Sequence, residues 1–283
     1  MSDPQSVRTP HDPQPTRPVR PQGAAEAGAA LAALVADPDR RPVLLAMDFD
    51  GTLAPLQDDP QASRLLPGAV TALAALAAHP DAVRLALVSG RSLVDLHRLA
   101  EIPVGTSLIG SHGAERAHLT AHGLDRDEVR LTEDQAARLE ALGTRMQAVA
   151  RGRDGVWVEA KPTAAVVHTR LADDAVAEVA EAEALVVGDE LGSTVLHGKD
   201  VVEVSVLDAD KGSALTALRA DLGAGAVVFA GDDVTDENAF GALRDGDVAL
   251  KVGPGDTRAG FRLADPQAMA TLLTDLAASL DER

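Results

Sequence analysis

Acidic side chains gather at two points of the sequence where a short apolar run ends. Asp48 and Asp50 follow one run and precede Gly51, and four acidic residues fall within 232–237 after another. Paired carboxylates at a strand end can divide the roles of nucleophile or metal ligand and of acid–base catalyst. Four acids in six positions repel one another unless a cation lies among them, and oxygen ligands favour Mg²⁺. An Asp-Gly turn and an acid-rich helix start are the non-catalytic alternatives.

Two further segments carry groups that could bind an anion. Ser89, Gly90 and Arg91 follow an apolar run and precede a predicted helix, where a hydroxyl and free N–H groups can hold a phosphate. A serine at this position is also a common helix cap. Lys211 follows Asp210 at the start of another predicted helix, where it could clamp a phosphate or remain a solvated surface lysine.

Alternating strands and helices must position these groups. Strands are predicted at 43–49, 83–88, 107–110, 226–230 and 248–252, because these runs are short and largely apolar. Helices are predicted at 67–78, 92–100, 213–222, 237–243 and 266–280. This rhythm indicates a parallel α/β sheet, in which ligands bind beyond the carboxyl ends of the strands. The candidate residues all fall at such ends or in adjacent loops.

A second pattern interrupts the first. Helices are expected at 133–149 and 173–184, with strands at 156–160, 165–170, 194–196 and 201–206. We therefore predict an α/β core at 39–117 and 206–283, with an inserted α+β module at 118–205. Residues 1–38 are predicted to be a tail and lead-in. Within them, 1–22 hold six of the sixteen prolines and are expected to be disordered, and 24–36 are expected to be helical.

Composition excludes several classes of function. The 283 residues include no cysteine, which excludes thiolate chemistry. The net charge of −18 argues against nucleic acid and anionic membranes as partners.

No apolar run approaches the length of a membrane span, and residues 1–22 lack the apolar centre of a signal peptide, so we expect a cytoplasmic protein. No long apolar stripe is evident, so we expect a monomer. Only 2% of residues are aromatic, which predicts ligand binding by hydrogen bonds and charge rather than by stacking.

Polar side chains share faces on the predicted strands of the inserted module. Alternation places Glu159 and Lys161 on the same face as Trp157, and it places Lys199 with Glu203. Such a face offers donors and acceptors for sugar hydroxyls. The alternative is a solvated sheet face with weak ion pairs.

Taken together, the motifs resemble those of the haloacid dehalogenase superfamily of phosphohydrolases. DxDGT, a Ser-Gly pair, a lysine and GDDxxD occur in this order, and the resemblance extends from about Arg41 to the C-terminus. It implies that Asp48 attacks phosphorus to form an aspartyl-phosphate and that Asp50 is the acid–base catalyst. The aspartate at position 50 is the pattern of the phosphatases and mutases, not of the dehalogenases.

The same resemblance implies a Mg²⁺ cofactor and a phosphate site. Mg²⁺ is expected to be held by Asp48, the Asp50 carbonyl and Asp232, with Asp233 and Asp236 in or near the first shell. Ser89, Gly90 and Lys211 are expected to bind the phosphoryl oxygens. The inserted module corresponds to the superfamily's cap.

Three strings narrow the resemblance to the trehalose-6-phosphate phosphatases. GSHGAE, VEAKPTAAVVHTR and GKDVVEV begin at positions 110, 158 and 198. They imply the following substrate-binding residues: Arg91, His112, Glu115, Glu159, Lys161, His168, Arg170, Lys199 and Glu203. In isolation, 110–115 would be a glycine-rich turn with a structural histidine.

The expected reaction is Mg²⁺-dependent hydrolysis of trehalose 6-phosphate to trehalose and phosphate, with a small sugar phosphate as the partner. Two alternatives remain open from the sequence. One is a phosphatase or phosphosugar mutase for another sugar phosphate. The other is a non-catalytic sugar-phosphate-binding subunit of a trehalose synthesis complex.

Overall fold

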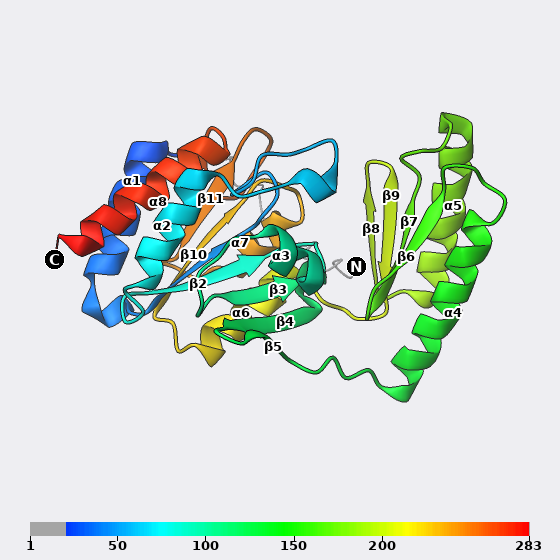
Figure 1. Ribbon diagram of the computed structural model, residues 1–283, viewed down its shortest axis with the longest axis horizontal. Helices are drawn as coiled ribbons and strands as arrows, with labels where there is room; N and C mark the ends of the chain where they lie inside the picture. Colours follow the sequence, from blue (N-terminus) through cyan, green and yellow to red (C-terminus); the bar gives the residue numbers. More distant parts are fainter. Residues whose placement is uncertain (1–20, 283) are drawn as a thin grey trace, which may run out of the picture.

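The computed structural model describes residues 21–282 and contains two sheets in two modules (Figure 1). The larger sheet has the strand order β12-β11-β10-β1-β2-β3-β4-β5. Its parallel strands are β1 (Val43–Met47), β2 (Val83–Val88), β3 (Ser107–Gly110), β10 (Ala226–Gly231), β11 (Val248–Val252) and β12 (Phe261–Leu263). The antiparallel strands β4 (Glu115–Thr120) and β5 (Gly123–Arg126) complete one edge. The predicted α/β core is confirmed.

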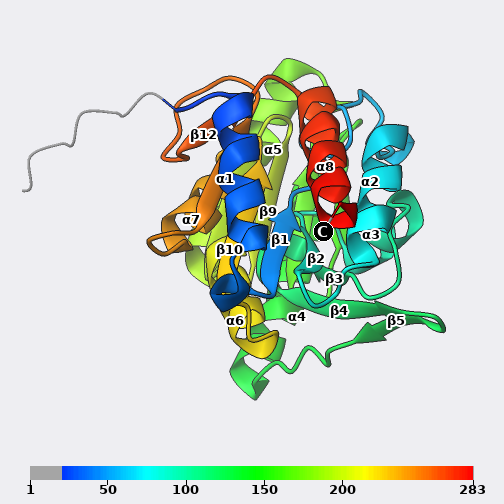
Figure 2. The same cartoon turned by 90° about the vertical axis from the view of Figure 1, so that its left-hand side faces the viewer.

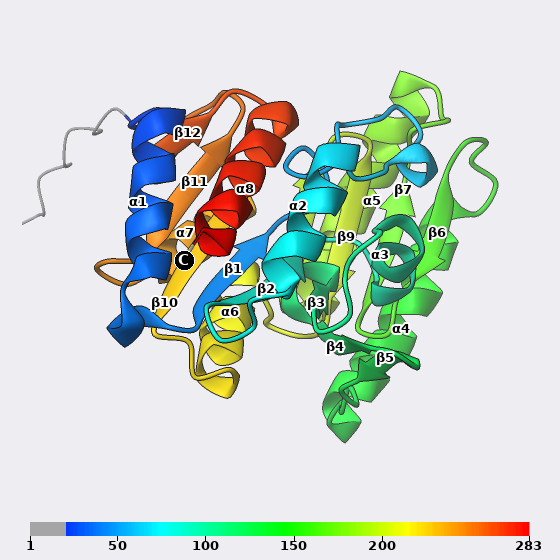
Figure 3. The ribbon, with the colours of Figure 1, turned by 60° about the vertical axis from the view of Figure 1, so that its left-hand side comes forward.

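Helices cover both faces of this core sheet. The helices α1 (Ala24–Ala36), α2 (Pro67–Ala77) and α8 (Pro266–Asp281) lie over one face, as Figures 2 and 3 show. The short helix α3 (Leu93–Leu99) packs on the same face, and α6 (Lys211–Asp221) and α7 (Asp236–Ala242) cover the other. Every residue of β1 is buried because both of its faces are covered. Packing on both sides therefore fixes the position of the carboxyl end of β1.

The cap module is the second unit, formed by the antiparallel sheet β6-β7-β9-β8 and two long helices. Its strands are β6 (Trp157–Ala160), β7 (Ala164–His168), β8 (Thr194–Gly198) and β9 (Val201–Ser205). The helices α4 (Glu133–Ala150) and α5 (Asp174–Leu191) cover one face around a separate apolar core. The other face of the sheet is turned toward the core module (Figure 1).

The boundary of the cap module differs from the predicted residue 118. The strands β4 and β5 belong to the core sheet, because β4 pairs with β3 and β5 pairs with β4. β4 alternates between buried and more exposed residues and β5 has no buried residue, as in an edge hairpin, whereas every residue of the central strand β1 is buried. The change of pattern therefore falls inside one sheet, and the cap module begins after β5.

The N-terminal segment also departs from expectation at one residue. Residues 1–20 of the segment predicted to be disordered lie outside the described residues. Gln22 pairs with Phe261 of β12 and so extends the sheet edge. Three single-turn helices, η1 (Pro38–Arg40), η2 (Pro60–Ala62) and η3 (Ser111–Gly113), complete the described chain. Between residues 21 and 282, none of the helices has both the length and the apolar character needed to cross a bilayer.

Candidate active site

A cavity of about 970 Å³ lies between the core and cap modules. The core contributes Asp48, Ser89 and Lys211 to its wall, and the cap contributes Trp157 and Lys161. Strand ends of the core sheet thus face the uncovered sheet of the cap, as the parallel topology predicts.

Three carboxylates converge at the core side of the cavity. Asp48 follows β1, Asp232 follows β10 and Asp236 begins α7, and oxygens of all three lie within 4.8 Å of one another. The parallel pairing of β1 with β10 brings the first two together. Gly51 permits the close approach, because a Cβ at this position would lie 1.9 Å from an Asp232 carboxylate oxygen. Gly51 also has a φ of +69°, which disfavours a side chain.

Lys211 is the only cation that pairs directly with this cluster in the described structure. Its Nζ lies 3.1 Å from Asp48 Oδ2 and 2.7 Å from Asp236 Oδ1. Burial raises the pKa of Asp48, Lys211 opposes that shift, and Asp236 and Asp232 add to it. Burial, Asp236 and Asp233 raise the pKa of Asp232 to about 6. Although burial lowers the pKa of Lys211, Asp48 and Asp236 outweigh it and raise that pKa.

The donor set of this cluster fits a hard divalent cation. Three carboxylates face one lysine, so the cluster keeps a negative charge that a cation would neutralise, and all of its donors are oxygens. Asp48, Asp232 and Asp236 could therefore hold a metal. Asp233, expected in or near the same shell, lies outside the cluster. Its side chain is exposed and accepts a hydrogen bond from the Val234 N–H at 2.6 Å.

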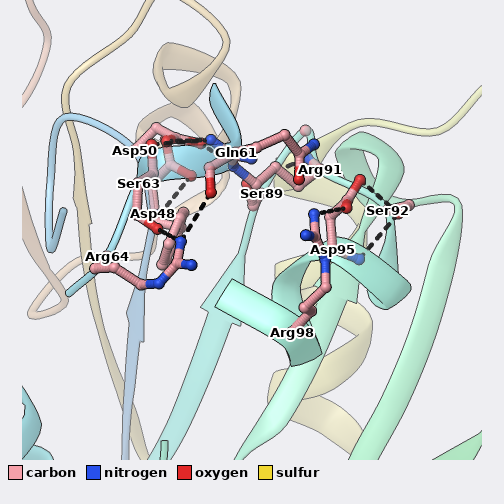
Figure 4. A network of polar contacts seen from close by, with 12 residues as sticks. Asp48, Asp50, Gln61, Ser63, Arg64, Ser89, Arg91, Ser92, Asp95 and Arg98 are labelled. Atoms are coloured by element: carbon pink, nitrogen blue, oxygen red, sulfur yellow. Dashed lines mark hydrogen bonds and ion pairs between the residues drawn. The ribbon is translucent and has the colours of Figure 1, made fainter. Parts of the chain in front are cut away.

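The side chain of Asp50 is also placed away from the carboxylate cluster, against Arg91 (Figure 4). Arg91 Nε lies 2.5 Å from Asp50 Oδ2, and Arg91 Nη2 lies 2.7 Å from Asp50 Oδ1. Arg91 Nη2 also donates to Ser63 Oγ at 3.1 Å. This two-pronged contact fixes both side chains at the cavity wall.

Two of the residues predicted to bind phosphate, Ser89 and Gly90, lie where β2 ends. Ser89 is buried, and its Oγ accepts a hydrogen bond from the Arg91 N–H at 3.2 Å. Gly90 allows His112 to pack against it, because a Cβ at Gly90 would lie 2.5 Å from the imidazole. Lys161 of the cap donates to the Gly90 carbonyl at 3.3 Å. The cap thus reaches the backbone of the predicted phosphate site.

His112 faces the cavity from a left-handed turn, with a φ of 55°. Burial, with the nearby charges of Lys211 and Lys161, lowers its pKa to about 3. Its Nδ1 is buried without a hydrogen-bond partner. The ring is therefore neutral at neutral pH.

Glu115 corrects the sequence prediction. It was expected to contact substrate, but it is buried behind the turn and does not line the cavity. Its Oε2 accepts hydrogen bonds from Ser111 Oγ at 2.6 Å and from the Leu93 N–H at 3.4 Å. Glu115 thus stabilises the turn that presents His112.

The cap residues form two pairs. Lys161 Nζ lies 2.7 Å from Glu203 Oε2, with side chains that are 8% and 12% exposed. Glu159 Oε2 lies 3.0 Å from His168 Nε2, and this hydrogen bond lowers the pKa of Glu159. Five of the six predicted cap residues line the cavity: Glu159, Lys161, His168, Arg170 and Lys199. Glu203 does not, and acts on the cavity through Lys161.

Two residues that were not among the predicted site residues also belong here. Lys251, at the end of β11, is buried and donates to the Asp232 carbonyl. A charged residue inside an otherwise apolar strand is the signal that could have found it. Trp157 lines the cavity as well, although the aromatic content predicted binding without stacking.

Comparison with known proteins decides the family. The family model described as Trehalose-phosphatase matches residues 46–266. The chain belongs to the trehalose-phosphatase family. It is 39% identical over 214 residues to a trehalose-phosphate phosphatase of Mycobacterium avium, covering 71% of this chain and 51% of that protein. It is 33% identical over 223 residues to the trehalose-6-phosphate phosphatase of Escherichia coli, covering 77% and 80%.

The curated relatives of this chain differ in length, and several solved structures share the fold of this chain. The chain matches 19% of a longer Mycobacterium tuberculosis protein named as an uncharacterized glycosyl hydrolase, at 36% identity over 258 residues and 86% of this chain. It thus spans between a fifth and a half of several curated relatives. The C-terminal domain of the Candida albicans trehalose-6-phosphate phosphatase superposes with a TM-score of 0.73 at 20% identity, covering 93% of this chain and 99% of that one.

Proposed function

We propose that this chain hydrolyses trehalose 6-phosphate to trehalose and phosphate, with Asp48 as the nucleophile. The placement of Asp48 carries the proposal. It is a buried carboxylate at a strand end, paired with Lys211 at 3.1 Å, in a cavity whose opposite wall is a polar sheet face. The curated relatives named as phosphatases of trehalose phosphate support the choice of substrate.

The reaction divides into two displacements. Asp48 Oδ attacks phosphorus, the bond from phosphorus to the sugar oxygen breaks, and Asp50 donates a proton to that oxygen. Water then attacks the phosphorus of the aspartyl-phosphate and Asp50 takes up the proton. Phosphate leaves and the Asp48 carboxylate is restored. Arg91 holds Asp50 in place at the cavity wall.

Positive charge around the phosphoryl group lowers the barrier to transfer. Lys211 and Ser89 would bind the phosphoryl oxygens, beside the Gly90 backbone. Mg²⁺ held by Asp48, Asp232, Asp236 and the Asp50 carbonyl would supply further positive charge there. Lys161, Glu159 and His112 would bind hydroxyls of the sugar, because they present donors and acceptors to the same cavity.

Phosphate release from a panel of sugar phosphates tests this proposal. The panel holds trehalose 6-phosphate, sucrose 6-phosphate, glucose 6-phosphate and mannose 6-phosphate, each with Mg²⁺ and with EDTA. We expect turnover of trehalose 6-phosphate that EDTA abolishes. Preference for another member would overturn the choice of substrate. No release from any member would overturn the catalytic role and favour a binding subunit.

A further inference from the structure

The single indole of the chain lies at the cavity, and no role has been assigned to it so far. Trp157 is the first residue of β6, lines the cavity and is 40% exposed. Three of the four phenylalanines are buried, and Phe261 packs against the main core. A chain with so few aromatic residues thus leaves its largest one accessible at a polar site. Accessible aromatic rings in such cavities commonly bind apolar surfaces of ligands.

The ring of Trp157 is held in a fixed orientation. Trp157 and His168 are direct partners across β6 and β7, and their rings stack with centroids 4.7 Å apart and planes 11° from parallel. The imidazole is itself fixed, because His168 Nε2 lies 3.0 Å from Glu159 Oε2. One face of the indole is therefore covered by His168. A ligand in the cavity can contact the part of the indole that His168 leaves exposed. Because the ring is already ordered, binding does not incur the entropic cost of ordering a mobile side chain.

The position of Trp157 along its strand indicates which part of a ligand it would meet. Lys161 lies at the opposite end of this segment, where its Nζ contacts the Gly90 carbonyl of the phosphate site at 3.3 Å. Lys161 follows Trp157 by four positions of extended chain, or about 13 Å at the usual rise. Glu159 lies between them on the same face. This distance exceeds the width of one hexose ring, so the sugar joined to the phosphoryl group lies near Lys161 and Glu159, and a second ring reaches the indole.

We propose that the indole of Trp157 is the stacking surface for the sugar ring distal to the phosphoryl group, so that this residue selects disaccharide phosphates over monosaccharide phosphates. The C–H face of a pyranose ring is apolar and complements an aromatic surface. Leu171, which also lines the cavity and is exposed, adds apolar surface to the same cavity. The inference rests on the proposed function and adds the basis of its selectivity.

Steady-state kinetics of Trp157→Ala and Trp157→Phe test this role. With trehalose 6-phosphate, we expect Trp157→Ala to raise KM on the order of tenfold, with kcat changed less than twofold. Its kcat/KM for 4-nitrophenyl phosphate, which has no distal sugar ring, should stay unchanged. Trp157→Phe keeps an aromatic surface and should recover most of the loss. Val179→Ala, at an exposed position of α5 that does not line the cavity, is the matched control.

Fluorescence supplies a readout that does not depend on turnover. Trp157 is the only tryptophan, so the emission of Asp48→Asn reports this ring alone while the substrate remains intact. Titration with trehalose 6-phosphate should change the emission in a saturable way, and titration with glucose 6-phosphate should change it far less. Equal changes with both ligands, or none, would overturn the proposal.

The two hypotheses fail in different ways. If the unaltered chain does not hydrolyse trehalose 6-phosphate, the proposed function falls and this inference falls with it. If the unaltered chain does so and Trp157→Ala keeps its KM, or loses activity equally on both substrates, only the role of Trp157 is overturned.

Discussion

Lys211 supplies positive charge at the point where a negatively charged protein must receive an anion. The chain carries a net charge of −18, which repels a phosphate ester at long range. Lys211 is only 2% exposed and lies between Asp48 and Asp236, and Arg91 and Lys161 line the same cavity. Buried charges are screened little by salt, so these cations attract a bound phosphoryl group at short range, and a cation held by the carboxylate cluster would add to them.

At the same scale, His112 should make folding stability depend on pH. Its pKa is about 3 in the folded chain and about 6.5 when unfolded, so between these values only the unfolded chain binds the proton. Stability is therefore lost as pH falls from about 6.5 toward 3. Asn tolerates the left-handed turn, so His112→Asn should remove this contribution, which is about 1 kcal/mol between pH 7 and pH 5.5.

Urea denaturation of both proteins at pH 7 and pH 5.5 measures this difference. Other titrating groups are common to both chains and cancel in the comparison. An identical pH dependence of the free energy of unfolding in the two proteins would show that His112 takes up its proton normally in the folded state.

At the scale of elements, the central strands were predictable and the edges were not. β1 and β10 are continuous apolar runs, and β2 is apolar except at Arg84, because helices cover both of their faces. β4 alternates between buried and more exposed residues, β5 has no buried residue, and β12 has only three residues, so none of them carries that signal.

The site residues also divide into those that the sequence could predict and those that depend on tertiary packing. Asp48, Ser89 and Lys211 were found because each follows a strand or starts a helix at a recognisable motif. The burial of Glu115 and the contact of Lys251 with Asp232 depend on how separate segments pack, which spacing along one segment does not reveal. The stacking of Trp157 on His168 likewise depends on the pairing of two strands.

The pairing of Glu203 with Lys161 gives a prediction at the scale of the cap strands. Both side chains are largely buried, so Glu203→Gln would leave Lys161 without its counter-charge and displace it from Gly90. We expect kcat/KM for trehalose 6-phosphate to fall at least about tenfold. Turnover of 4-nitrophenyl phosphate should change little, because it lacks the sugar.

The matched control is Glu183→Gln. Glu183 lies on α5, is exposed to solvent and forms an ion pair with Arg153, which this substitution removes. That variant should behave like the unaltered chain on both substrates. Equal losses on both substrates in Glu203→Gln would instead assign this pair to folding of the cap rather than to substrate binding.

At the scale of the whole molecule, metal binding should stabilise the fold in a pH-dependent way. The folded-state pKa of Asp232 is raised to about 6, above its ordinary value, so the metal-free protein loses stability as pH rises from about 4 through 6. A divalent cation replaces the proton and relieves the repulsion among the three carboxylates. Saturating Mg²⁺ should raise Tm on the order of 5 °C at pH 7.5 and by much less at pH 5.

Thermal unfolding with and without Mg²⁺, at equal ionic strength set with NaCl, checks this expectation. A shift of equal size at both pH values would point to a nonspecific salt effect. No shift at pH 7.5 would show that the carboxylate cluster does not bind the ion.

The role of Asp48 is tested most directly by phosphate release from trehalose 6-phosphate by the unaltered chain and by Asp48→Asn. Both would be assayed with Mg²⁺, after circular dichroism has shown the same fold. Loss of a nucleophile should lower turnover by at least about 10³-fold, because Lys211 and the bound cation can stabilise the phosphoryl group but cannot replace the attacking oxygen. Turnover by Asp48→Asn within tenfold of the unaltered chain would contradict nucleophilic catalysis by Asp48.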